Sequence, residues 1–77
     1  MNKARRKSLA AISSQLESLK ADLEVLRDEE QEYLENMPEG LQQSERGQAS
    51  EDAITQLDDA LDGVDAVIET LSEVIDG

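Results

Sequence analysis

The sequence predicts an all-α protein, an antiparallel hairpin of two long helices that forms a single domain over residues 1–77. Two long stretches repeat apolar residues at alternating spacings of three and four, which is the heptad pattern of coiled-coil helices. The only proline lies between these two stretches. Aromatic residues, which favour strands, are reduced to Tyr33. These observations together indicate two helices joined by one bend.

The first apolar repeat predicts a helix from about residue 3 to about residue 36. No glycine or proline interrupts this stretch. Pro38 disfavours a helical backbone at the residue before it, so the helix is expected to end there. The predicted core column is Leu9, Ile12, Leu16, Leu19, Leu23 and Leu26, continued in register by Glu30, Tyr33 and Met37.

A bend over residues 37–43 leads into the second predicted helix, which spans about residues 44–76. Ser44 and Ser50 are both candidate N-caps. We prefer Ser44, because it lets the hairpin close in register, although it places Gly47 in the first turn. The predicted core column is Ile54, Leu57, Leu61, Val64, Ile68, Leu71 and Ile75. A second apolar column, one residue before alternate members of the first, is Ala53, Ala60, Val67 and Val74.

An antiparallel register in which paired residue numbers sum to 80 places apolar residues opposite each other in six layers, from Leu26 with Ile54 to Leu9 with Leu71. Nearer the bend, it places Tyr33 beside Gly47 and Glu30 beside Ser50, whose hydroxyl can hydrogen-bond the carboxylate. Leu41 is expected to close the seam at the bend. At the open end, the expected ion pairs join Arg5, Arg6 and Lys7 to Glu73 and Asp76.

One two-helix seam buries too little apolar surface to offset the entropy lost by 77 ordered residues. The second apolar column, Ala53, Ala60, Val67 and Val74, is not used by that seam, so we expect an oligomer interface there. The expected assembly is a homodimer that forms a four-helix bundle. The alternative is that this column is a docking groove for a helix of another protein.

No catalytic, metal or cofactor site is expected. The chain has no His and no Cys, which removes the usual zinc ligands and the commonest general base. Carboxylates are abundant, but a two-helix seam offers no apolar pocket that would raise the pKa of one of them. Residues 58–69 partly match a calcium loop, but Ala60 stands where an oxygen ligand is needed. We therefore expect a protein that is not an enzyme.

The charge distribution predicts a protein partner with a basic surface. The net charge of −12 divides into +4 over residues 1–8 and −16 over the rest. Such a chain repels nucleic acid and anionic membranes, so direct contact with either is not expected. No stretch has the length and apolarity of a transmembrane helix, and a cytoplasmic location is expected.

Acidic residues gather on two surfaces that are candidate partner-binding sites. Carboxylates one helical turn apart roughly match the phosphate spacing of a nucleic-acid strand, so such a surface can occupy a basic groove as a DNA mimic. The alternative is a solvated face that keeps a small protein soluble. The candidates are Asp58, Asp62, Asp65 and Glu69 in the second helix, and Asp28, Glu29, Glu32 and Glu35 at the end of the first.

The bend carries the pieces Asn36-Met37-Pro38-Glu39 and Leu41-Gln42-Gln43-Ser44-Glu45 and is followed by an acidic amphipathic helix. This segment resembles the joint between two helices in small acidic hairpin proteins of phages and mobile elements, with Gly40 where Asn is expected. The resemblance implies a phage or prophage origin and no catalytic residues. By analogy, it implies an accessory or anti-defence inhibitor, of the anti-CRISPR or anti-restriction class, that engages a nucleic-acid-handling protein. The alternative function is a structural or assembly protein that acts through helix–helix oligomerisation.

Overall fold

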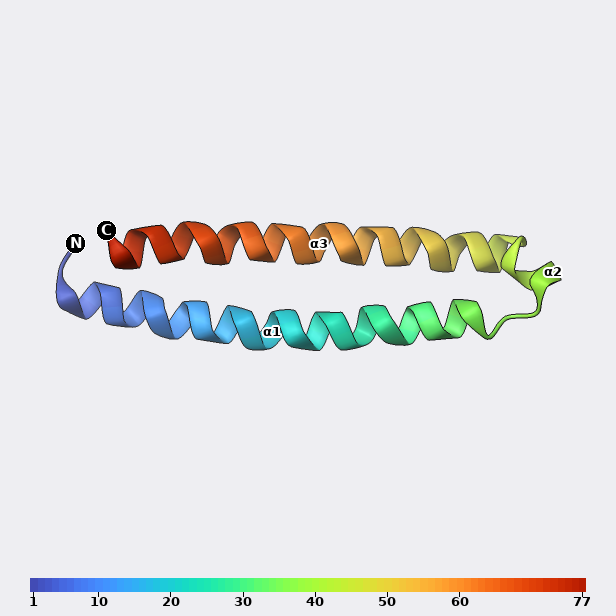
Figure 1. Cartoon of the computed structure of the whole chain (residues 1–77), viewed down its shortest axis with the longest axis horizontal. Helices are drawn as coiled ribbons and strands as arrows, with labels where there is room; N and C mark the ends of the chain where they lie inside the picture. Colours follow the sequence, from blue (N-terminus) through green and yellow to red (C-terminus); the bar gives the residue numbers. More distant parts are fainter.

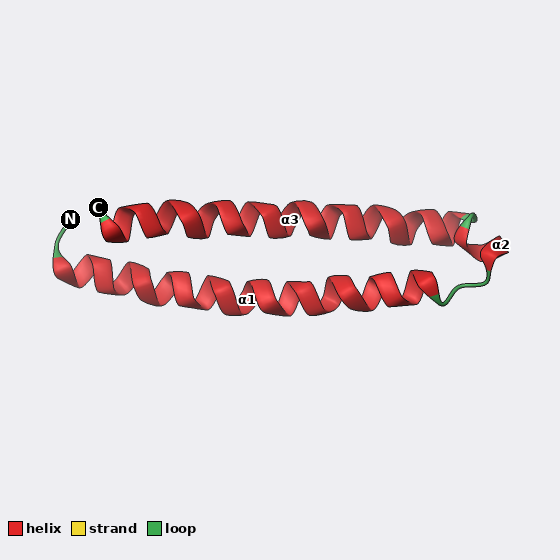
Figure 2. Ribbon diagram, in the orientation of Figure 1, coloured by secondary structure: helices red, strands yellow, loops and turns green.

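The computed structural model describes all 77 residues, and it is helical except for the termini and two short connections (Figure 2). Its elements are α1 (Lys3–Glu35), α2 (Glu39–Gln42) and α3 (Glu45–Asp76). The two long helices lie side by side and run antiparallel, so both termini lie at one end of the molecule (Figure 1). The molecule is an elongated rod of 58 × 15 × 12 Å. The predicted all-α class is confirmed.

Helix α1 begins at a side-chain cap and ends just before the proline. The Asn2 side chain accepts a hydrogen bond from the backbone N–H of Arg5 at 2.8 Å, which satisfies one of the free donors of the first turn. The helix ends at Glu35, and the N–H of Met37 still donates to the carbonyl of Leu34. Pro38 then adopts an extended backbone, with φ −56° and ψ 145°.

The bend contains a one-turn helix, α2, that the sequence pattern did not predict. The carbonyl of Pro38 accepts from the N–H groups of Leu41 and Gln42 at 2.8 and 3.1 Å, which closes this turn. The side-chain amide of Gln42 donates to the carbonyl of Met37 at 3.0 Å. Met37 is buried, whereas Leu41 is 45% exposed. The expectation that Leu41 closes the seam was wrong, because α2 turns this side chain outward and Met37 takes its place.

Helix α3 begins at Glu45 with Ser44 at the N-cap, but the Ser44 hydroxyl does not cap it. The hydroxyl instead donates to the carbonyl of Leu41. Gly47 is buried against the backbone of the bend, and a Cβ atom there would lie 2.0 Å from the carbonyl oxygen of Gln42. The predicted packing of Tyr33 on Gly47 was wrong, because the atoms nearest to that site belong to Gln42.

The face that α1 turns toward α3 differs from the predicted one in every second layer. Leu9, Leu16 and Leu23 are partly buried, as predicted, but the alternate positions are filled by Ser13, Lys20, Arg27 and Leu34. The residues predicted there are each 46–57% exposed, namely Ile12, Leu19, Leu26 and Tyr33. The two columns differ by one residue, about 100° around the helix. In this rotation Lys20 and Arg27 form ion pairs with α3.

The face that α3 turns toward α1 is the predicted one. Ile54 is buried, and the later members of its column, from Leu57 to Ile75, are partly buried. The predicted hydrogen bond from the Ser50 hydroxyl to the Glu30 carboxylate is confirmed, with a length of 2.7 Å. This bond fixes the axial register of the two helices near the bend.

Packing is tightest near the bend and loosens toward the termini. The four buried residues all lie between positions 37 and 54, and they are Met37, Gly47, Ser50 and Ile54. No side chain is fully buried. The seam therefore encloses little apolar surface along most of the rod. None of the helices combines the length and the apolarity needed to cross a membrane.

Candidate protein-interaction surfaces

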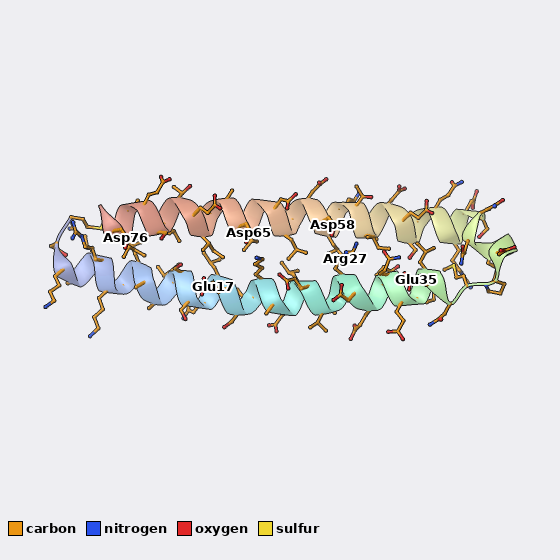
Figure 3. The ribbon with its side chains drawn as sticks, viewed as in Figure 1. Glu17, Arg27, Glu35, Asp58, Asp65 and Asp76 are labelled. Carbon is orange, nitrogen blue, oxygen red and sulfur yellow. The ribbon has the colours of Figure 1, made fainter.

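One flank of the helix pair is crossed by two ion pairs. Arg27 of α1 donates to Asp58 of α3 through Nε at 2.9 Å and through Nη2 at 3.4 Å. Lys20 Nζ lies 2.6 Å from Asp65 Oδ1. Figure 3 shows Arg27 reaching from α1 toward Asp58 on α3. The two pairs are seven residues apart on both helices, so they lie on the same side, which we call the ion-pair flank.

These ion pairs raise the pKa of both basic groups. The hydrogen bond to Asp65 is the largest cause of the raised pKa of Lys20, and the charges of Asp65 and Glu24 add to it against partial desolvation. The hydrogen bond to Asp58 likewise raises the pKa of Arg27. Two of the four candidate acids of α3, Asp58 and Asp65, are therefore held by cations of the same chain.

The acids of α3 occupy only three of the seven heptad positions. With Ile54, Leu61, Ile68 and Ile75 at position a, every Asp and Glu of α3 falls at position b, e or f. These positions are neighbours around a helix, so they form one continuous acidic face that extends from the ion-pair flank to the side of α3 away from the seam. The acidic face consists of Glu45, Glu51, Asp52, Asp58, Asp59, Asp62, Asp65, Glu69, Glu73 and Asp76.

A second acidic surface surrounds the bend, at the end of the rod remote from the termini. Asp28, Glu29, Glu32 and Glu35 are exposed in the last two turns of α1, as predicted from their positions. Asp28 lies 3.5 Å from Arg27 Nη1. The helix has no basic residue in its last turn, so Glu29, Glu32 and Glu35 lie near the negative end of the helix dipole without a compensating charge. Residues 28–45 contain seven acids and no base. We call this region the acidic bend.

The basic N-terminal segment does not form the ion pairs expected of it. The ion pairs of the structure involve only Lys20 and Arg27 as cations, so Arg5, Arg6 and Lys7 do not reach Glu73 and Asp76. The reason is geometric, because Glu73 and Asp76 fall at positions f and b, which point away from α1. The Nε atom of Arg6 is enclosed and has no hydrogen-bond partner.

The flank opposite the ion pairs is apolar on both helices. In α1 this flank carries the exposed column from Ile12 to Tyr33, which was predicted from the sequence to lie inside the seam. In α3 it carries the column predicted as an oligomer interface, in which Val67 is 49% and Val74 38% exposed, Ala60 is exposed and Ala53 partly buried. We call this surface the apolar flank, and it consists of Ile12, Leu19, Leu26, Tyr33, Ala53, Ala60, Val67 and Val74.

Two features extend the apolar flank. From Gly47 to Gly77, positions a, c, d and g of α3 contain no charged residue, so the flank is uncharged across this helix. Near the termini it is hollowed into a shallow apolar groove lined by Ala66, Val67, Thr70 and Leu71. The α1 members of the flank were missed as interface residues, because the heptad pattern alone assigns them to the seam.

The structure offers no arrangement of acids around a metal ion, since no three His, Cys, Asp or Glu side chains converge. The segment that partly matches a calcium loop, residues 58–69, is continuous helix within α3. Comparison with protein-family models, with curated proteins and with solved structures finds no match to this chain. The two acidic surfaces and the apolar flank are therefore the features from which a function is inferred.

Proposed function

We propose that the protein is a non-catalytic binding protein that presents the acidic face of α3 to a basic surface of a partner protein. The observation that carries this proposal is the confinement of all ten acids of α3 to three neighbouring heptad positions. Solubility alone would not require this confinement, because the exposed positions of the apolar flank could carry charges as well. One-sided clustering concentrates negative potential, which favours association with a basic groove.

The partner that fits best is a protein that handles nucleic acid. Successive turns of α3 present carboxylates at a rise of about 5.4 Å per turn, close to the spacing of phosphates that a nucleic-acid-binding groove accepts. Asp58 and Asp65 are held in place by Arg27 and Lys20, whereas Asp62 and Glu69 are exposed. A DNA mimic combines these properties, and the resemblance to phage proteins implies, by analogy, an accessory inhibitor.

The test removes exposed acids of α3 without touching the two ion pairs that join the helices, whereas one residue of the control, Glu24, pairs with Lys20 within α1. The variant D59N/D62N/E69Q removes three charges from the acidic face, and the control E17Q/D22N/E24Q removes three charges from α1. Each variant captures proteins from a host lysate at low and at high salt, and a captured nucleic-acid-binding protein is then challenged with duplex DNA. We expect salt-sensitive capture that duplex DNA reverses, that the control retains and that D59N/D62N/E69Q loses.

Unchanged capture by D59N/D62N/E69Q, with an unchanged helical circular dichroism signal, would contradict a role for the acidic face. Loss of capture by a third variant, E29Q/E32Q/E35Q, with the acidic face intact, would instead assign binding to the acidic bend. The three variants therefore separate the two acidic surfaces.

The exposed apolar flank favours a second function, assembly through helix–helix contacts. We propose that two copies pair through this flank into a four-helix bundle, which covers side chains that the chain alone leaves exposed. The variant V67E/V74E places two charges on the flank, and the control Q48E/T55E places two on the acidic face. Light scattering after size-exclusion chromatography should show a dimer for the control and a monomer for V67E/V74E. A monomeric wild-type protein would contradict the bundle.

A further inference from the structure

We propose that the two copies of this bundle lie head to tail, so that the basic N-terminal segment of each copy contacts the acidic bend of the other. The inference rests on the proposed homodimer and adds its orientation, which identifies the occupant of the apolar flank as a second copy in a defined pose. Four observations support this orientation: the charges at the two ends of the rod, the unpaired cations, the exposed area of one copy and the symmetry of the α1 column.

The two ends of the rod carry opposite charges. Residues 28–45, around the bend, carry −7, because they contain seven acids and no base. Residues 1–8 and 70–77, at the other end, together carry +2, because they contain four bases and two acids. The long axis of 58 Å separates these ends. This exceeds the Debye length of about 10 Å at 0.1 M salt, so neither end neutralises the other within one copy.

The relative orientation of the two copies determines whether the charges at their ends attract or repel each other in a dimer. In a head-to-tail dimer, each end of the bundle combines the −7 of one copy with the +2 of the other. In the opposite orientation, with both bends at one end, 14 carboxylates of residues 28–45 would crowd together, twice the seven of one copy. Like charges at helix-packing distance repel one another, so the head-to-tail pose is the favoured one.

The N-terminal cations are free to make this contact. Lys20 and Arg27 are engaged within the chain, whereas Lys3, Arg5, Arg6 and Lys7 make no ion pair. Carboxylates from the bend of the second copy supply ion-pair partners for these cations, because Glu73 and Asp76 of the same copy do not reach them.

The exposed area of one copy fits an interface of the size that stable dimers use. A compact protein of 8.5 kDa exposes about 4,700 Å², whereas this chain exposes 5664 Å². A compact protein of twice this mass exposes about 7,700 Å², which is about 3,600 Å² less than two separate copies. Interfaces of obligate homodimers bury about 2,000–5,000 Å² in total.

The α1 column of the flank is symmetric about its own midpoint. A twofold axis that crosses between Leu19 and Leu26 packs α1 against α1 of the second copy in antiparallel orientation. Leu19 then meets Leu26 of the other copy, and Ile12 meets Tyr33 of the other copy. The same axis brings residues 3–7 beside residues 38–42, with Glu35 and Glu39 within reach. The apolar groove near the termini of one copy then faces the bend of the other, where Leu41 is exposed.

The chain has no cysteine, so a single spin label reports the orientation directly. The variant Q43C is labelled at the bend, and the distance between the two labels of a dimer is measured by double electron–electron resonance. A head-to-tail dimer should give a distance comparable to the 58 Å long axis. Bends at the same end would give a distance within about 20 Å, two helix diameters. That short distance would overturn the orientation while leaving the bundle intact.

A charge reversal tests the contact itself. The variant K3E/R5E/K7E should weaken the head-to-tail dimer roughly tenfold or more, because three attractive contacts become repulsive at both ends of the bundle. The control K20E/D65K reverses one internal ion pair and should leave dimerisation unchanged. Equal dimer affinity of K3E/R5E/K7E and the wild type, at equal helical content, would overturn the proposed contact. A monomeric wild-type protein would overturn both the bundle and the orientation, but not the proposed role of the acidic face.

Discussion

Replacement of Gly47 by alanine tests the packing of the bend, because the same replacement at Gly63 should act in the opposite direction. Both glycines lie inside α3, where Gly→Ala normally stabilises a helix by about 1 kcal/mol. At Gly63, a new Cβ meets nothing within 4 Å, so this gain should be realised. At Gly47, the Cβ would lie 2.0 Å from the carbonyl oxygen of Gln42 and 2.7 Å from its Cα. These are backbone atoms, so the bend itself has to move.

The expected cost of G47A is about 1–3 kcal/mol, the range for overpacking a well-packed site, or more if α2 loses its place. For a domain of this size, 1 kcal/mol corresponds to about 4–8 °C in Tm. Thermal unfolding followed by circular dichroism, at one fixed protein concentration, should place G63A above the wild type and G47A well below it. If G47A matches or exceeds the wild type in Tm, α2 does not pack on Gly47.

Three further predictions concern the seam and the flank. S50A should lower the free energy of unfolding, measured in urea, by about 1–3 kcal/mol, because it leaves the partly buried Glu30 carboxylate without its hydrogen-bond donor. An unchanged free energy of unfolding would contradict the register fixed by that bond. K20M should lower Tm by a constant amount between neutral pH and the ordinary Lys pKa of 10.5, because the ion pair raises the pKa of Lys20 in the folded protein. This difference should shrink as higher pH deprotonates Lys20 in the folded wild type, and a difference that stays the same from neutral pH to pH 12 would contradict the ion pair. L26E should abolish the dimer, and L26Q should weaken it less. Both variants should keep their helical content, because Leu26 is 54% exposed in one copy. Global unfolding of L26E would show instead that Leu26 lies in the seam between α1 and α3.

The sequence determined one helix face correctly and left the other ambiguous. In α3, every acid lies on one side of the helix, at positions b, e and f, so the column from Ile54 to Ile75 was unambiguous. In α1, the column containing Leu19 and Leu26 and the adjacent one containing Lys20 and Arg27 share the same heptad spacing. The more apolar column, with Leu19 and Leu26, was predicted to lie in the seam, but the structure turns the column with Lys20 and Arg27 toward α3. Long aliphatic stems cover apolar surface while the charged ends reach the ion-pair flank.

A signal for this rotation was present in the charges. Lys20 and Arg27 are the only bases between residues 8 and 45, and they are seven residues apart. Asp58 and Asp65 have the same spacing in the opposing helix, so a matched pair of ion pairs could have been inferred. The one-turn helix α2 had no such signal, because four residues carry no periodicity. The packing of Gln42 on Gly47 depends on that turn and was not predictable for the same reason.

The two proposed surfaces are compatible because they lie on different sides of α3. Positions b, e and f hold every acid of this helix, whereas c and g, on the other side, hold none. A dimer through the apolar flank therefore leaves the acidic faces of both copies directed outward. Neutralising the acidic face should not change assembly, and blocking the flank should not remove an acid from the acidic face. In the proposed dimer, the apolar flank would supply the buried apolar surface that one copy lacks, and the acidic faces would remain free for the proposed basic partner.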